Sequence, residues 1–190
     1  DLKIKHSLKT KIIYVSSDYV FDGEKGNYKD TDLPYPRTNY GKTKFLSEKA
    51  LKNFGHDYLI IRSSAAMGKG GVFFDWLIRS LKKETVLEMY SNIYFTPTPI
   101  KMLCEGILHL IENYKDKKIY HICGPKIFSR YEFATFVKKL QPAFTCEIKP
   151  VLLGGNSIFQ KDLSIIQSDI CNVFATKTFE NYIIEEILYD

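Results

Sequence analysis

Residues 12–23 read IIYVSSDYVFDG, and this stretch decides the fold class of the chain. It opens with an apolar run, Ile12–Val15, in which apolar and polar residues do not alternate. Strands of this kind are typical of parallel sheets, because helices cover both faces of such sheets. Two hydroxyl side chains, Ser16 and Ser17, follow the run. The pattern therefore predicts a buried strand that ends in polar groups.

Downstream of this strand, signals for helices and strands alternate. Residues 18–39 are rich in Asp, Gly, Pro and Asn and predict a loop. Residues 40–54 predict a helix that stops at Gly55, and residues 58–62 predict a second buried strand. Helices and strands joined by short connections are typical of an α/β fold.

The remaining segments continue this pattern. A Ser-x-x-Glu capping box at Ser129 and Glu132 marks a helix start. Gly68–Gly71 lacks the arrangement of a phosphate loop and is expected to form a flexible turn. Further helices are expected over 72–81, 100–113, 130–140 and 178–188, strands over 86–90 and 119–122, a turn over 96–99, and irregular structure over 150–170.

The composition narrows the class of protein. With 190 residues, of which 45% are hydrophobic and 26% charged, the chain suits one globular domain or part of a larger one. Its formal net charge of +5 suits anionic ligands such as nucleotide phosphates, but the interspersed acidic residues argue against nucleic-acid binding. No apolar run is long enough to span a membrane and no signal-peptide pattern is present, so we expect a cytoplasmic location.

The four cysteines, Cys104, Cys123, Cys146 and Cys171, lie far apart and have no His partner at metal-binding spacing. We expect buried free thiols in a reducing compartment, and no metal site. His121 lies inside an apolar strand and is expected to be a hydrogen-bonded core or pocket-lining residue.

Tyr40 and Lys44 are the candidate catalytic pair. They are four residues apart at the start of the predicted helix, so they share one helix face. The ammonium favours the phenolate and lowers the tyrosine pKa from about 10. Together with Ser17 they form a candidate Ser-Tyr-Lys constellation in which Tyr40 is the acid or base. On spacing alone, a solvated helix face is the better explanation of the pair, since the chain contains 13 tyrosines. The segments that surround the pair favour the catalytic interpretation.

The segments around this pair resemble a known family. IIYVSSDYVFDG and PYPRTNYGKTKFLSEKAL are similar to the substrate loop and catalytic helix of extended short-chain dehydrogenases/reductases. Within this group the chain resembles the dTDP-4-dehydrorhamnose reductases over residues 10–140. Matching later segments are LIIRSSAAMGKGG, FTPTPIKMLCEGILHLI and KIYHICGPKIFSRYEFATFV.

The resemblance implies an NAD(P)H-dependent reductase of a nucleotide-linked 4-keto sugar, which works in nucleotide-sugar and cell-surface polysaccharide biosynthesis. Ser17 is then expected to orient the keto oxygen and Tyr40 to protonate it. Lys44 is expected to hold the nicotinamide ribose and to lower the pKa of Tyr40. Ser63 and Ser64 are expected to line the nicotinamide of NADP or NAD, together with Tyr40 and Lys44.

Ser17, Asp18 and Tyr19 match substrate contacts of the family. Asp18 also fits a second interpretation as a turn former that hydrogen-bonds its own backbone. An aromatic residue contacts the sugar after the R-[TS]-S turn in several relatives, and this chain has Ala65 there. The identity of the sugar is therefore left open.

The implied fold is the C-terminal part of a Rossmann-like doubly wound parallel sheet with a small mixed α/β substrate-binding region. Residues 1–64 are expected to form part of the NAD(P)-binding region, and residues 65–190 mainly the substrate-binding region. The Gly-rich fingerprint of such folds is absent from the sequence. We therefore expect roughly 60 residues, at about 30 per strand–helix unit, to be missing before residue 1.

Two other functions remain open. One is a nucleotide-sugar epimerase or dehydratase on the same scaffold, although Tyr19 does not supply the second carboxylate that a dehydratase uses. The other is a non-catalytic regulatory subunit, because the beta subunit of methionine adenosyltransferase has a similar strand end and Tyr-Lys helix. The expected partner is a nucleotide sugar, with no nucleic acid or membrane, and a homodimer stays open.

Overall fold

The computed structural model describes residues 11–53, 57–114, 118–154, 160–171 and 175–188. The helices are α2 (Asn39–Asn53), α3 (Val72–Lys83), α4 (Ile100–Asn113), α5 (Arg130–Leu140) and α6 (Phe179–Leu188), with 3-10 turns η1 (Asp18–Val20) and η2 (Asp169–Cys171). The strands are β1 (Ile12–Ser17), β2 (Tyr58–Ser63), β3 (Ala66–Met67), β4 (Val86–Tyr90), β5 (Tyr94–Phe95), β6 (Thr98–Pro99), β7 (Ile119–Ile122), β8 (Phe128–Ser129) and β9 (Glu147–Val151).

A parallel sheet with the strand order β1-β2-β7 forms one half of the molecule. In its register Ser17 lies beside Ser63, and Ser63 lies beside Ile122. The carboxyl ends of all three strands therefore meet at one edge. This sheet confirms the predicted α/β class and the positions of both predicted strands. Burial is confirmed for β2 but not for β1, an edge strand in the order β1-β2-β7 in which Val15 is 39% exposed.

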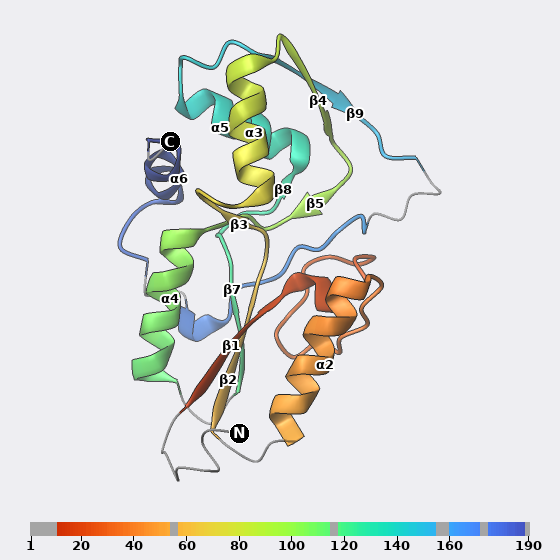
Figure 1. Cartoon of the computed structure of the whole chain (residues 1–190), viewed down its shortest axis with the longest axis vertical. Coiled ribbons are helices and arrows are strands. Elements are labelled where there is room, and N and C mark those ends of the chain that lie inside the picture. Colours follow the sequence, from red (N-terminus) through yellow and green to blue (C-terminus); the bar gives the residue numbers. More distant parts are fainter. Residues whose placement is uncertain (1–10, 54–56, 115–117, 155–159, 172–174, 189–190) are drawn as a thin grey trace.

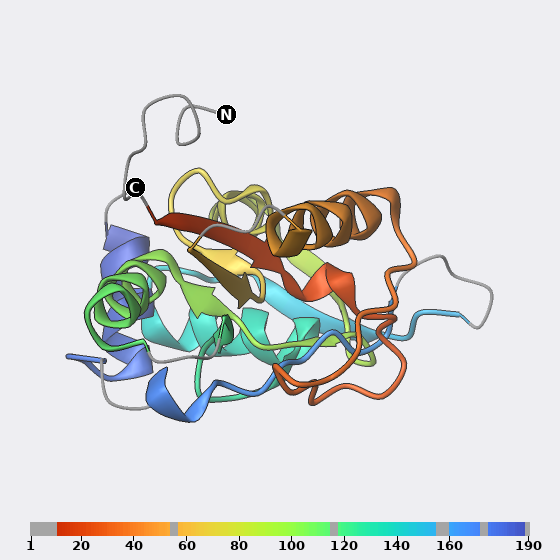
Figure 2. The same cartoon turned by 90° about the horizontal axis from the view of Figure 1, so that it is seen from below.

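Helices cover both faces of this sheet, with α2 on one side and α4 on the other (Figures 1 and 2). Successive side chains of a strand point to opposite faces. Leu59 and Ile61 of β2 accordingly belong to a core cluster with Met102 and Leu110 of α4. Arg62 points the other way, to α2. Burial on both faces explains why the pattern of β2 lacks alternation.

The other half of the molecule contains β4 paired in parallel with β9, and helices α3, α5 and α6 (Figure 1). Its core is rich in phenylalanine; Phe95 and Phe128 both make edge-to-face contacts with Phe133. Two short pairs, β3 with β6 and β5 with β8, run between the two halves. This arrangement leaves the carboxyl edge of the parallel sheet facing the second half.

The loop after η1 is held by a segment from the far end of the chain. Tyr28 donates its backbone N–H to Ser164 at 2.9 Å, and Ile166 donates to the Tyr28 carbonyl at 2.8 Å. Gly23 has φ +75°, and a Cβ there would lie 2.4 Å from the Gln160 Cβ. The close approach of the two segments therefore requires glycine at this position.

Several predictions of local structure needed correction. Residues 147–151 form β9, a strand that was not expected and that overlaps the start of the region 150–170, which was expected to be irregular. Cys104 is exposed rather than buried. The strand was missed because it contains Pro150 and its side chains are mostly exposed, so no apolar pattern marks it. The predicted helix stop at Gly55 lies outside the described residues. In the described part of the chain, every helix is too short or too polar to cross a bilayer.

Candidate active site

Four residues predicted from the sequence meet at the carboxyl edge of the sheet. The Ser17 hydroxyl donates to Asp18 Oδ1 at 2.8 Å, and the Ser64 hydroxyl donates to Asp18 Oδ2 at 2.6 Å. Ser63 lies beside Ser17 in the register of β1 and β2, and its hydroxyl donates to the Ser64 carbonyl at 3.0 Å. All four side chains are buried. The Asp18 carboxylate also has a backbone hydrogen bond with Tyr19, so the local turn contact and the contacts with the two serines occur together.

Burial sets the acidity of this carboxyl group. It raises the pKa of Asp18 from 3.8 to about 6. The hydrogen bonds from Ser64 and Ser17 and the positive charge of Arg130 act in the opposite direction, since they favour the carboxylate. Asp18 is thus mostly ionised at pH 7, but its proton affinity is far higher than that of a surface aspartate.

Tyr40 and Lys44 lie on the first turns of α2, beside this cluster. The Lys44 ammonium is 5.7 Å from the centroid of the Tyr40 ring and donates to the Val15 carbonyl at 3.1 Å. The Tyr40 ring meets Tyr19 edge to face, with centroids 5.6 Å apart. Tyr40 is 53% exposed, so its phenol is accessible to a ligand. Tyr19 thus connects the Tyr-Lys pair to Asp18.

Close packing of α2 against η1 depends on Gly41. A Cβ at this position would lie 2.0 Å from the Tyr19 carbonyl oxygen and 3.1 Å from the Pro36 Cβ. Only glycine allows the helix to approach the loop so closely. The glycine between Tyr40 and Lys42 therefore brings the tyrosine to the end of β1.

A buried ion pair anchors the same helix to the sheet. Arg62 of β2 donates to both carboxylate oxygens of Glu48, at 2.9 and 2.7 Å, and Ser16 donates to Glu48 at 2.7 Å. Glu48 is 0% and Arg62 1% exposed. Glu48 follows Tyr40 and Lys44 at four-residue steps, so all three share one helix face. This pair was not predicted from the sequence, in which an arginine within an apolar strand was the available signal.

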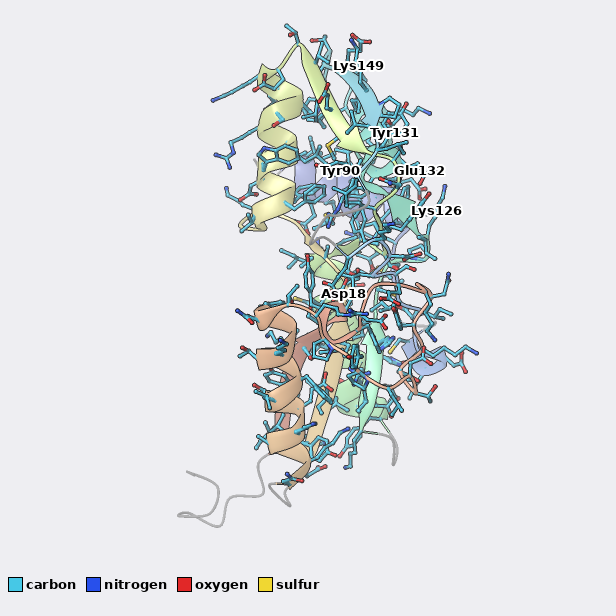
Figure 3. All side chains as sticks on the ribbon, turned by 90° about the vertical axis from the view of Figure 1, so that its right-hand side faces the viewer. Asp18, Tyr90, Lys126, Tyr131, Glu132 and Lys149 are labelled. Atoms are coloured by element: carbon cyan, nitrogen blue, oxygen red, sulfur yellow. The ribbon has the colours of Figure 1, made fainter. Side chains whose placement is uncertain are left out.

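A cavity of about 410 Å³ opens between the two halves of the molecule. Asp18 and Tyr19 line it on one side, and Figure 3 shows Asp18 at the junction with Tyr90 in the half above. This volume lies within the range of small-molecule sites. The other lining residues are Thr38, Ala65, Phe73, Trp76, Glu88, Met89, Tyr90, Ile93, Tyr94, Phe95, Arg130, Gln160 and Leu163.

The donor groups at the sheet edge fit one face of a nicotinamide nucleotide. Lys44 uses one hydrogen bond on Val15, and an ammonium has three donors, so two remain for ribose hydroxyls. Open α/β sheets bind ligands at the carboxyl ends of their strands, where Ser63 and Ser64 lie. Ala65, in the place of the family's aromatic residue, lines the cavity itself.

The parallel sheet with polar groups at its carboxyl edge, followed by a Tyr-x-x-x-Lys helix, defines the class as extended short-chain dehydrogenase/reductase-like. The chain belongs to the RmlD substrate binding domain family, whose model matches residues 4–155.

Three relatives illustrate this membership. The spore coat polysaccharide biosynthesis protein SpsK of Bacillus subtilis is 35% identical over 128 residues, 66% of this chain and 44% of that protein. A dTDP-4-dehydrorhamnose reductase of Aggregatibacter actinomycetemcomitans is 32% identical over 138 residues, 69% of this chain and 46% of its own length. The methionine adenosyltransferase 2 subunit beta of Xenopus laevis is 28% identical over 149 residues, 70% and 42% of the two chains. The chain thus spans less than half the length of these relatives.

Solved structures share the fold. A dTDP-4-dehydrorhamnose reductase from Clostridium acetobutylicum has a TM-score of 0.83 and 25% identity, covering 95% of this chain and 66% of that one. A dTDP-4-dehydrorhamnose reductase from Bacillus anthracis, solved in complex with NADP, has a TM-score of 0.82 and 24% identity with the same coverage. Both agree with the Rossmann-like arrangement of the parallel sheet.

Proposed function

We propose that this chain forms the catalytic and substrate-binding part of an NAD(P)H-dependent reductase of a nucleotide-linked 4-keto sugar. The reaction is of the dTDP-4-dehydrorhamnose reductase type and serves nucleotide-sugar and polysaccharide biosynthesis. One observation carries the proposal: the Ser17–Asp18–Ser64 cluster and the Tyr40–Lys44 pair converge at the end of β1, next to a cavity of about 410 Å³.

Each predicted residue has a role in this reaction. A reduced nicotinamide, when bound, supplies the hydride to the keto carbon. Tyr40 gives its phenolic proton to the keto oxygen, which gains negative charge as the hydride arrives. Rotation about its C–O bond lets the Ser17 hydroxyl turn from Asp18 to the keto oxygen and orient it. The Lys44 ammonium stabilises the Tyr40 phenolate that remains.

Binding roles follow the same geometry. Lys44 and Tyr40 hold the nicotinamide ribose, and Ser63 and Ser64 line the nicotinamide of NADP or NAD. Asp18 and Tyr19, with Ser17, contact the sugar, because Asp18 and Tyr19 line the cavity.

We assign residues 1–64 to the NAD(P)-binding region and residues 65–190 mainly to substrate binding. We place the reaction in the cytoplasm, where its nucleotide substrates are made. Whether the protein is a homodimer stays open, and sedimentation tests it.

A non-catalytic function is the second candidate. It is favoured by the similarity to methionine adenosyltransferase 2 subunit beta, which extends over 70% of this chain. In that case the polar cluster would bind a ligand, and the protein would act on a catalytic partner. Copurification with such a partner, without reduction of a keto sugar by either nicotinamide, would favour this candidate. A dehydratase is disfavoured because Tyr19 does not supply the second carboxylate that such an enzyme uses, and product analysis with nucleotide 4-keto sugars separates a reductase from an epimerase.

Replacing Tyr40 by phenylalanine tests the proposal. Without the phenol no proton reaches the keto oxygen, and we expect turnover of dTDP-4-keto sugars to fall by about a hundredfold or more, with nucleotide binding nearly unchanged. Tyr35→Phe is the matched control, since Tyr35 is an exposed loop tyrosine. Turnover that survives Tyr40→Phe at the level of the control contradicts the proposed role.

A further inference from the structure

Arg130 occupies an unusual position in the cavity wall. It is the first residue of α5, and the Ser129–Glu132 capping box fixes the start of that helix. Its guanidinium lies 4.2 Å from the ring centroid of Phe73 and 4.1 Å from that of Phe95. Two aromatic rings thus hold the planar group in one orientation.

The charge of Arg130 is incompletely compensated. Its Nη1 nitrogen is buried and has no hydrogen-bond partner among the described residues. Within the same part of the chain, Arg130 forms no ion pair; Asp18 acts on it electrostatically but already accepts hydrogen bonds from two serines. A buried charged donor without an acceptor is costly. Burial accordingly lowers the pKa of Arg130.

The composition of the cavity indicates what could satisfy this donor. Arg130 is the only basic side chain among the described residues that line it, and most of the others are aromatic or aliphatic. A guanidinium binds carboxylate and phosphate oxygens through parallel N–H groups. Asp18 and Glu88 are the acidic residues of the lining, so an oxyanion would have to lie at Arg130. A largely apolar cavity with one fixed cation therefore suits a ligand that combines a ring with an oxyanion.

We propose that Arg130 is an oxyanion-binding residue in this cavity and selects ligands that carry a phosphate or carboxylate group beside the sugar. The inference deepens the proposed function, on which its assignment to a sugar nucleotide rests. Asp18 and Tyr19 line the same cavity, so the oxyanion lies near the sugar. Two sources offer this chemistry, namely the diphosphate that joins nucleotide and sugar, and a carboxylate on the sugar ring.

Trp76 provides a direct measurement of binding. It is the only tryptophan of the chain and lines the cavity, so its fluorescence reports on occupancy. dTDP and glucuronate serve as probes for the two sources, and glucose as the neutral comparison. We expect Arg130→Met to weaken binding of one anionic probe by about ten- to a hundredfold, because a charge-assisted hydrogen bond is lost. Methionine suits the space between two phenyl rings.

Lys126→Met is the matched control, because Lys126 also lies over a phenyl ring, 5.0 Å from the Phe128 centroid, but does not line the cavity. It should leave both affinities unchanged. Arg130→Lys keeps the charge but loses the planar fork, and should bind the anion with intermediate affinity. A thermal melt of each variant shows that it is folded.

The outcomes separate the two sources and the two hypotheses. If Arg130→Met binds dTDP more weakly than the unmodified protein does, the diphosphate is the group that Arg130 binds. If it binds glucuronate more weakly, that group is a sugar carboxylate. Equal affinity of Arg130→Met and the unmodified protein for both probes, or no Trp76 response to either, overturns the inference. Arg130-dependent binding without any keto-sugar reduction by the full-length protein would overturn the reductase function alone. Turnover without Arg130-dependent binding would overturn only the inference.

Discussion

At the scale of single residues, the protonation of Asp18 in the candidate site affects the free energy of unfolding. Its folded pKa of about 6 lies above the value of 3.8 for an unhindered carboxyl group, so the folded state holds the proton more tightly than the unfolded state. The contribution of Asp18 to the free energy of unfolding is largest below about pH 4 and declines as the pH rises through 6. Asp18 therefore destabilises the folded protein at neutral pH.

Asp18→Asn should remove this effect. Asparagine does not ionise, so its free energy of unfolding lacks this pH dependence. We expect the difference in unfolding free energy, variant minus unmodified protein, to be larger at pH 7.5 than at pH 4 by up to about 2–3 kcal/mol. Urea unfolding of both proteins at the two pH values measures the change. Asp169→Asn, at an exposed position, is the control and should show little pH-dependent difference. A stability difference for Asp18→Asn that is the same at both pH values would contradict the assigned pKa.

The predictability of the site also differs from residue to residue. Ser17, Asp18, Tyr40 and Lys44 could be found from the sequence because short stretches carry their spacing and the strand end before them. Arg130 could not be found from the sequence. The local sequence shows only the capping box of a helix start, and the residues that surround the Arg130 side chain come from α3 and β5. Contacts between residues far apart in the chain leave no local pattern.

At the scale of elements, the position of α2 depends on one buried ion pair. Glu48 and Arg62 link the helix to β2, and removal of one partner leaves the other charge buried and unpaired. We expect Glu48→Gln to cost about 3–5 kcal/mol of unfolding free energy. Denaturant unfolding measures this loss, and Glu112→Gln on the exposed face of α4 should cost little by comparison.

A double variant distinguishes the pair from general damage to the core. Replacing Glu48 and Arg62 together by leucine removes both charges, so we expect it to be less destabilising than either single replacement. Additive losses would contradict a direct coupling between the two side chains.

Elements with a strong apolar pattern were predictable. The expected ranges of α4, β4 and β7 agree with the structure, since each has a clear pattern of burial. Strand β9 was not predictable, because its own sequence carries two charged residues and a proline. Its pairing with β4 stabilises it instead. The strand exists because of its neighbour.

At the scale of the whole molecule, α6 joins the two cores. Phe179, Ile183 and Ile187 belong to the phenylalanine-rich cluster, whereas Tyr182 belongs to the cluster beneath the parallel sheet. The two halves of the molecule should therefore unfold together.

Ile183→Ala tests this connection. Ile183 is 0% exposed, and its truncation should cost about 2–5 kcal/mol. We expect Trp76 fluorescence, which reports on one half, and hydrogen exchange of the β2 amides, which reports on the other, to give the same loss. A loss seen by Trp76 alone would show that the halves unfold separately. Leu188→Ala, at an exposed position of the same helix, is the control.

The pairing of the loop after η1 with residues 160–166 has a consequence for synthesis. A ribosome makes the chain from its N-terminus, so the sheet strands and the Tyr40–Lys44 helix emerge long before Gln160 and Leu163. Those late residues form part of the cavity wall. A nascent chain therefore cannot enclose a ligand in this cavity until residues 160–163 have left the ribosome, and a product of interrupted translation carries the reactive groups without the enclosure around them.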